Sequence, residues 1–275
     1  MKLAIAVVML SAVLPISQAQ QPAISPTAAD DPCSAQSRPS FEVATIKPSD
    51  KPAGGSSMRR RSDSFTSSSV LRRLILFSYD LHEFQLTGGA DWVKTQVWEI
   101  SAKVDPPDAD PVKLDEAGRK ALIDTERQRL QSLMADRFKF KCHMTTKELP
   151  IYELVPAKGG TKLTPTTAAP EKQSSMSSSG NDRSEKLVAT GILLSDLVRY
   201  LSSEVGRSIV DKTALTGRYD MTMTFRPAMA SAADSDASGA TIFTALEEQL
   251  GLKLVPAKGP VKVLVIDSVE KPSEN

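Results

Sequence analysis

Two histidines are the residues in this chain best suited to acid–base or metal chemistry. His82 follows an expected helix, and His143 lies on an expected strand directly after Cys142. Neither has a second histidine or a cysteine pair at metal-ligand spacing, which excludes a zinc site of the His-Glu-x-x-His kind. A Cys142–His143 dyad is disfavoured because adjacent strand residues point to opposite faces of a sheet. We therefore expect no metal and no cofactor, and we retain His143 as a candidate ligand or partner contact.

The sequence motifs of the common hydrolases are missing or misplaced. The chain has no Gly-x-Ser-x-Gly turn and no phosphate-binding loop. Ser268-Val-Glu-Lys271 has the Ser-x-x-Lys spacing, but it follows the last expected strand instead of opening a helix. The paired acids Asp108 and Asp110, and Glu247 and Glu248, are typical of a solvated surface. A hydrolase that uses Ser, Asp or Tyr in a cleft between two lobes remains an alternative, because such a site leaves no local motif.

The densest polar cluster is the segment from Asp211 to Asp220. A turn in which Asp211 accepts backbone amides and Lys212 is solvated explains most of it. Contact with a ligand is the second interpretation, so Asp211 and Lys212 are candidate contacts.

The N-terminus predicts export. Residues 1–19 have the basic start, apolar run and small residues of a secretory signal peptide, and we expect cleavage after Ala19. Cleavage removes one lysine and no acid, which leaves 33 basic side chains against the 33 acidic ones of the chain. A neutral mature chain gives no reason to expect nucleic acid as a partner. We expect a periplasmic or extracellular protein without a transmembrane anchor.

Residues 20–40 read as a disordered leader, and they contain one of the two cysteines, Cys33. Export allows a disulfide between Cys33 and Cys142. The alternative is a mobile thiol at Cys33 and a buried, apolar Cys142. The sequence favours this unpaired alternative, because it cannot place the two residues within bonding distance.

The order of expected elements predicts an α+β fold of two similar lobes, each a small mixed sheet packed with two helices. Residues 41–160 form the first lobe, 161–185 a flexible linker rich in Ser, Thr and Pro, and 186–275 the second lobe. Both lobes show a helix followed by a strand and a second helix followed by a hairpin. This shared order indicates an internal duplication.

Four helices and two hairpins carry this prediction. The first lobe is expected to have helices over residues 70–79 and 115–135, and the second over 194–205, ended by Gly206, and 241–250, ended by Gly251. The hairpins pair 138–144 with 151–155, and 252–255 with 261–267. On the long helix, the apolar stripe includes Leu122, Leu130, Leu133 and Met134, whereas Glu126, Arg127 and Arg129 are assigned to the solvated face.

Several segments spread along the mature chain are distinctive in combination: Phe41-Glu-Val-Ala-Thr-Ile-Lys-Pro48, Gly88-Gly89 with Trp92, Leu133-Met-Ala-Asp-Arg-Phe138, Lys147-Glu-Leu-Pro-Ile-Tyr152, Asp211-Lys-Thr with Gly217-Arg-Tyr-Asp220, and Phe243 to Leu254. Together they resemble an uncharacterised exported family of soil bacteria, of the Acidobacteria type. Trp92, Arg137 and Arg218 lie on these motifs and join the candidate contacts. Ala90 and Ala214 depart from the family pattern of proline and glycine, which affects the turns there.

The resemblance implies an exported protein without an established activity. It also implies that related domains are fused to membrane metallopeptidase sensors. Each lobe is also weakly similar to the short N-terminal domain of secretins and TonB-dependent receptors. The function expected from the sequence is a non-enzymatic binding or interaction module of the cell envelope, with an envelope protein or cell-wall component as partner. The alternatives are the cleft hydrolase and a sensor domain for small ligands.

Overall fold

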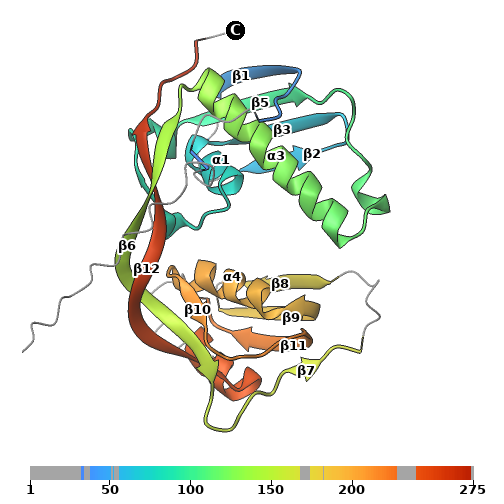
Figure 1. Ribbon diagram of the computed structural model, residues 1–275, viewed down its shortest axis with the longest axis vertical. Helices are drawn as coiled ribbons and strands as arrows, with labels where there is room; N and C mark the ends of the chain where they lie inside the picture. The colour runs from blue at the N-terminus through green and yellow to red at the C-terminus, as the bar shows by residue number, and fades with distance from the viewer. Residues whose placement is uncertain are drawn as a thin grey trace, which may run out of the picture.

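The computed structural model describes residues 32–33, 38–50, 52, 56–167, 174–181, 183–227 and 240–273. The predicted signal peptide and most of the predicted leader lie outside these residues. The described chain is a mixed α+β protein with three small sheets, which confirms the expected fold class (Figure 1). No helix within these ranges is long and apolar enough to cross a membrane.

The first half of the molecule is a four-stranded antiparallel sheet in the order β1-β5-β3-β2, covered by helices α1 and α3. Its elements in chain order are β1 (Val43–Ser49), β2 (Ser57–Arg60), β3 (Ser64–Val70), α1 (Leu71–Ser78), β4 (Leu86–Gly88), α2 (Trp92–Thr95), β5 (Val97–Lys103) and α3 (Glu116–Arg137), with short 3-10 turns at Glu83–Gln85 and Pro111–Lys113. The long helix begins where it was predicted, because the side chain of Asp115 accepts a hydrogen bond from the Gly118 amide.

The second half is a four-stranded sheet in the order β7-β11-β9-β8. Its elements are β7 (Thr164–Pro165), β8 (Ser175–Asn181), β9 (Ser184–Leu193), α4 (Leu194–Val205), β10 (Ile209–Asp211), β11 (Arg218–Phe225), α5 (Ile242–Ala245) and a π-helical turn (Leu246–Leu250). Helix α4 buries Leu194, Leu197 and Leu201 on one face. It ends at Gly206, whose φ of 62° is the left-handed conformation that glycine adopts without strain.

A long two-stranded ribbon joins the halves. Strand β6 (Lys141–Pro156) pairs with β12 (Leu252–Ser268) in antiparallel register along almost its whole length. Two short strands extend the ribbon in parallel, β10 beside β6 and β4 beside β12. The two predicted hairpins are therefore wrong, because each is one continuous strand. The prolines within these strands are tolerated, because the outer side of a ribbon has positions without ladder hydrogen bonds; they are Pro150, Pro156, Pro256 and Pro260.

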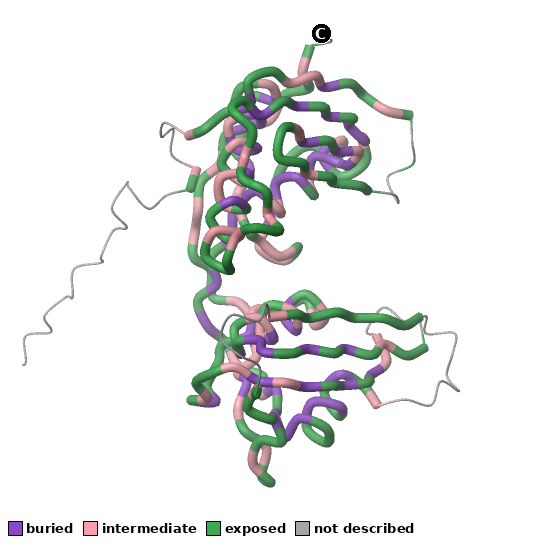
Figure 2. The backbone as a smooth tube through the Cα atoms, turned by 90° about the vertical axis from the view of Figure 1, so that its right-hand side faces the viewer, coloured by how far each residue is buried: buried purple, intermediate pink, exposed green. Residues whose placement is uncertain are grey.

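The buried side chains form two main cores, one in each half (Figure 2). The first core gathers residues of β1, β3, α1, β5 and α3, together with Leu264 and Ile266 from β12. The second core gathers residues of β9, α4, β11 and α5, together with Leu154 of β6 and Leu252 of β12. The end of the chain, which the sequence assigned to the second lobe, therefore packs into the first core as well.

Part of the predicted linker 161–185 belongs to the second half. Leu163 is buried in the second core, and β8 pairs with β9 along its whole length. The composition of this segment suggested a linker because serine and glycine dominate it. An edge strand that packs neither face against a core needs no large apolar residues, and β8 is such a strand.

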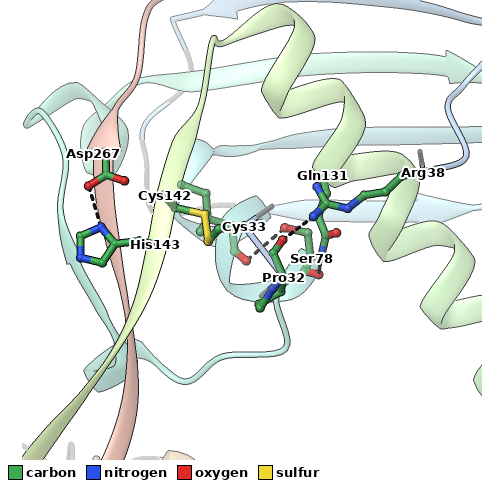
Figure 3. The surroundings of a disulfide bond; sticks show 9 residues. Pro32, Cys33, Arg38, Ser78, Gln131, Cys142, His143 and Asp267 are labelled. Carbon is green, nitrogen blue, oxygen red and sulfur yellow. Dashed lines mark hydrogen bonds and ion pairs between the residues drawn. A yellow bond between two sulfur atoms is a disulfide. The ribbon is translucent and has the colours of Figure 1, made fainter. Parts of the chain in front are cut away.

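A disulfide joins Cys33 to Cys142, with their Cα atoms 5.4 Å apart (Figure 3). The unpaired alternative favoured by the sequence is therefore wrong. The bond ties the segment before β1 to the beginning of β6, beside the first core. His143 points to the opposite side of β6, where its Nδ1 atom lies 2.7 Å from Oδ1 of Asp267 (Figure 3).

Candidate functional site

A cleft of about 500 Å³ lies between the two halves. The first half contributes Asp80 and His82 from the turn after α1, and Glu116 from the start of α3. The second half contributes Ser174–Met176 at the start of β8, and Asp196, Arg199 and Tyr200 from α4. Another hollow lies on the hydroxyl-rich surface of the first sheet. The cleft brings together more ionisable groups from distant parts of the chain, and it is therefore the candidate site.

Asp80, from the first half, pairs with one arginine of each half. Its carboxylate accepts hydrogen bonds from Arg127 of α3, at 2.6 Å, and from Arg199 of α4, whose Nη1 lies 3.0 Å from Oδ2. Asp80 has a positive φ of 54°, in the left-handed region that aspartate adopts more readily than most residues. Two guanidinium groups from different halves thus share one carboxylate at the cleft.

A second ion pair crosses between the halves at Glu116. Arg218, at the start of β11, donates to both carboxylate oxygens of Glu116, at 2.9 and 3.1 Å, and also to the carbonyl of Gly191 at 2.8 Å. Both contacts to Glu116 come from Nη2, while Nη1 donates to Gly191, so the guanidinium joins the start of α3 to the end of β9. Arg218 is the one sequence-predicted candidate contact that the structure brings to the rim of the cleft.

His82 supplies a neutral imidazole to the cleft. Burial lowers the pKa of His82, the nearby charge of Arg199 lowers it further, and the charge of Asp80 raises it in part. The ring stacks on Phe84, with the ring centres 5.4 Å apart. At neutral pH such an imidazole has one nitrogen that donates and one that accepts a hydrogen bond, which suits ligand binding or proton transfer.

Tyr200 contributes a protonated hydroxyl. Its oxygen donates a hydrogen bond to Glu185 at 2.9 Å. Burial and this hydrogen bond raise the pKa of Tyr200, so the hydroxyl keeps its proton. Burial and the charge of Glu185 also raise the pKa of Glu204. Tyr200 therefore offers no phenolate anion to the cleft, and its one hydroxyl proton is already donated to Glu185.

One face of α3 forms the opposite side of the cleft. Glu116, Arg119, Lys120, Ile123, Asp124 and Arg127 lie three or four residues apart and line a continuation of about 480 Å³. Asp124 is paired with Lys120 at 2.7 Å and with Arg127 at 3.3 Å. Arg119 makes no ion pair with any residue that the structure describes.

The other candidate contacts lie outside the cleft lining. Trp92 packs against Trp98 and Phe138, and Arg137 donates to the carbonyl of Ala44 at 3.1 Å. Asp211 accepts hydrogen bonds from the amide and the hydroxyl of Thr213, each at 2.8 Å, as the turn interpretation expects. Lys212 lies in the same turn and donates its backbone amide to Leu154. His143 faces Asp267 on the ribbon.

No sequence motif marked Asp80, Arg199 or Tyr200 as part of a site. These residues come together only because the halves pack face to face, and Asp80 and Arg199 are 119 residues apart. One local signal was present, and it indicated only a turn. An aspartate directly after a short helix, such as Asp80 between α1 and His82, suits a left-handed turn.

Replacement of Arg199 is expected to change the titration of His82. In Arg199→Gln the positive charge that lowers the pKa is lost while Asp80 remains, so the pKa of His82 should rise. Two-dimensional NMR of the ring protons of His82 measures the change. The signal of His143 in the same sample is the reference, because its partner Asp267 is untouched. An unchanged His82 titration would contradict the described contact of Arg199 with the cleft.

These features define the class: an α+β protein of three small sheets with a charged cleft between two halves. The chain belongs to a family of proteins of unknown function, DUF3738, whose model matches residues 72–269. This match confirms the expected membership of a family without known activity, whereas the soil-bacterial origin and the likeness to the secretin domain stay predictions. Searches of curated proteins and of solved structures found no match.

Proposed function

We propose that this protein is an exported, non-enzymatic binding module whose ligand or partner occupies the cleft between the halves. The observation that carries the proposal is the composition of the cleft, in which both halves contribute side chains and ion pairs at Asp80 and Glu116 cross between them. Sites between two packed units are common places for ligands. An envelope protein or a cell-wall component remains the proposed partner.

The disulfide supports export. Disulfides persist in oxidising compartments and are rare in the reducing cytosol. The Cys33–Cys142 bond fits the signal peptide predicted for residues 1–19, and a periplasmic or extracellular location is part of the proposal.

Site-specific crosslinking tests the binding role. A photo-reactive amino acid placed at Ser203, which lines the cleft, should form an adduct with a partner when the exported protein is irradiated in intact envelopes. The same amino acid at Thr222, an exposed position on β11 outside the cleft, is the matched control. Adducts at Ser203 alone support the proposal. Adducts at neither position, or equally at both, would remove its basis.

We also infer that the two halves repeat one structural unit. The strand orders β1-β5-β3-β2 and β7-β11-β9-β8 correspond position by position, and in each half one strand leads directly into a helix, β3 into α1 and β9 into α4. The short strands correspond as well, since β4 joins β12 in parallel and β10 joins β6 in parallel. This order supports duplication followed by divergence, with the cleft at the junction of the repeats.

One observation favours a second candidate, the cleft hydrolase. The lowered pKa of His82 leaves a neutral imidazole in the cleft, which is the state that a general base requires. Equal rates of ester hydrolysis by the purified protein and by its His82→Gln variant would dismiss this candidate.

A further inference from the structure

Strand β8 has a free backbone edge. It lies at one end of its sheet and, among the residues that the structure describes, pairs with β9 alone; all of its residues are exposed. In an antiparallel ladder, every second residue turns its N–H and C=O groups away from the paired strand. β8 therefore presents backbone donors and acceptors that match those of another extended chain.

The other edges of the first-half and second-half sheets carry features that discourage pairing. β7 is two residues long and contains Pro165, β2 carries Arg59 and Arg60, and β1 carries Lys47 and Pro48. Short length, charge and proline are the usual ways in which proteins protect an edge. The sequence of β8, Ser-Met-Ser-Ser-Ser-Gly-Asn, has neither a charge nor a proline. β2 and β8 occupy the same place in their sheets, yet only β8 lacks this protection.

The free edge faces the cleft. β8 is the strand of its sheet nearest the first half (Figure 1), and residues of α3 line one hollow together with Ser174, the residue before β8. The start of β8, Ser174–Met176, lines the cleft, and Met176 is 37% exposed. Ile123 of α3 lines the same region and is 36% exposed. An added strand would thus lie between β8 and a helix face with one accessible apolar side chain on each side.

The charges of the cleft favour an acidic occupant. Each of its carboxylates is already engaged: Asp80 with Arg127 and Arg199, Glu116 with Arg218, Asp124 with Lys120, and Asp196 with the amide of Leu193. By contrast, Arg119 has no ion pair among the described residues. The Nη1 of Arg119 donates to a backbone carbonyl, that of Leu114. An incoming carboxylate would therefore find a guanidinium without an ion pair, whereas an incoming cation would find every described carboxylate of the cleft already engaged.

We propose that the cleft binds an extended, acidic segment of another protein, which adds to β8 as a further strand of the sheet. The inference rests on the proposed binding function and names the kind of partner. Strand addition supplies affinity through backbone hydrogen bonds and specificity through alternate side chains.

The test uses peptides as probes. Random decapeptides displayed on phage are selected against the mature protein with its disulfide intact, and the enriched peptides are synthesised for measurement of Kd. We expect enrichment of Asp and Glu, and Arg119→Glu should weaken binding about tenfold, equivalent to about 1.4 kcal/mol. Lys186→Glu, the same charge reversal at an exposed position of β9 outside the cleft, is the control and should leave Kd unchanged.

Backbone methylation of the peptides distinguishes strand addition from other binding. Methyl groups on alternate amides of one register block hydrogen bonds to β8, while those of the other register point away. Strand addition predicts loss of binding in one register only. Equal effects in both registers would overturn strand addition while leaving cleft binding intact. Absence of any enriched peptide would also overturn it, and crosslinking at Ser203 would still decide the proposed function separately.

Discussion

Between pH 4 and pH 8, the wild type should lose about 3 kcal/mol of unfolding free energy that the variant Glu126→Gln does not lose. Glu126 is 1% exposed, and neither carboxylate oxygen has a hydrogen-bond partner among the described residues. Arg129 lies 4.0 Å away but already donates to both oxygens of Asp108, at 2.6 and 2.9 Å. Burial raises the pKa of Glu126 from 4.5 to about 7, although Arg129 and Arg60 lower it in part.

The direction follows from proton binding. Between the unfolded pKa near 4.5 and the folded value of about 7, the native state holds a proton that the unfolded chain has lost. The stability from protonated Glu126 is therefore complete below pH 4.5 and is lost as the pH rises to 7. Glutamine has no proton to lose, so the free energies of unfolding of variant and wild type should diverge across this window.

Urea unfolding at a series of pH values measures the divergence. The difference between the two curves is the relevant quantity, because any cost of the glutamine amide in the core is the same at each pH. Asp136→Asn removes an exposed acid from the same helix and is the control. A constant difference between Glu126→Gln and wild type from pH 4 to pH 8 would show that the native state does not hold this proton.

Loss of the disulfide should have the second large effect. The bond closes a loop between residues 109 positions apart, and loops of this length restrict the unfolded chain strongly. We expect the double variant Cys33→Ser/Cys142→Ser to lose about 4 kcal/mol of unfolding free energy. For a chain of this size the melting temperature should fall by roughly 10 °C.

Reductant provides the internal control for this prediction. Dithiothreitol should bring the wild type to the stability of the double variant and should leave the variant itself unchanged. Equal stability of the oxidised wild type and the variant would mean that the bond does not restrict the unfolded state. Both proteins are compared at one pH, so that Glu126 contributes equally.

Local patterns predicted the helices well and the strand pairing poorly. Helix α4 was predicted with its observed bounds, because its apolar stripe and Gly206 are both local signals. The β6–β12 ribbon was missed because the two strands are separated by most of the second half, and their prolines resemble turn signals. Pairing over such a distance depends on the packing of both cores, which no short window contains.

The misplacement of Glu126 has a more specific cause. Glu126 lies four residues after Leu122 and four before Leu130, so it occupies the middle of the apolar stripe of α3. It was assigned to the solvated face because of its charge, although its spacing indicated burial. The position of Glu126 in the helix predicted its burial correctly, whereas its residue type did not. An acidic residue at an apolar position of a helix therefore marks an ionisable group with a raised pKa.

The candidate site was the part least accessible to prediction. Arg218 was found through a motif, but Asp80, His82 and Arg199 form a site only after the halves have packed. Their residue types are common on protein surfaces, and their spacing along the chain is not that of any known motif.

The shared ribbon sets the order in which the molecule can be completed. β12 is the last strand of the described chain, yet it supplies Leu264 and Ile266 to the core of the half that is synthesised before it. The first half therefore cannot finish folding on the ribosome until nearly all of the described chain has emerged, unlike the domain-by-domain folding of many larger proteins. If a chain must cross a membrane in an unfolded state, this arrangement would prolong the period in which it can do so.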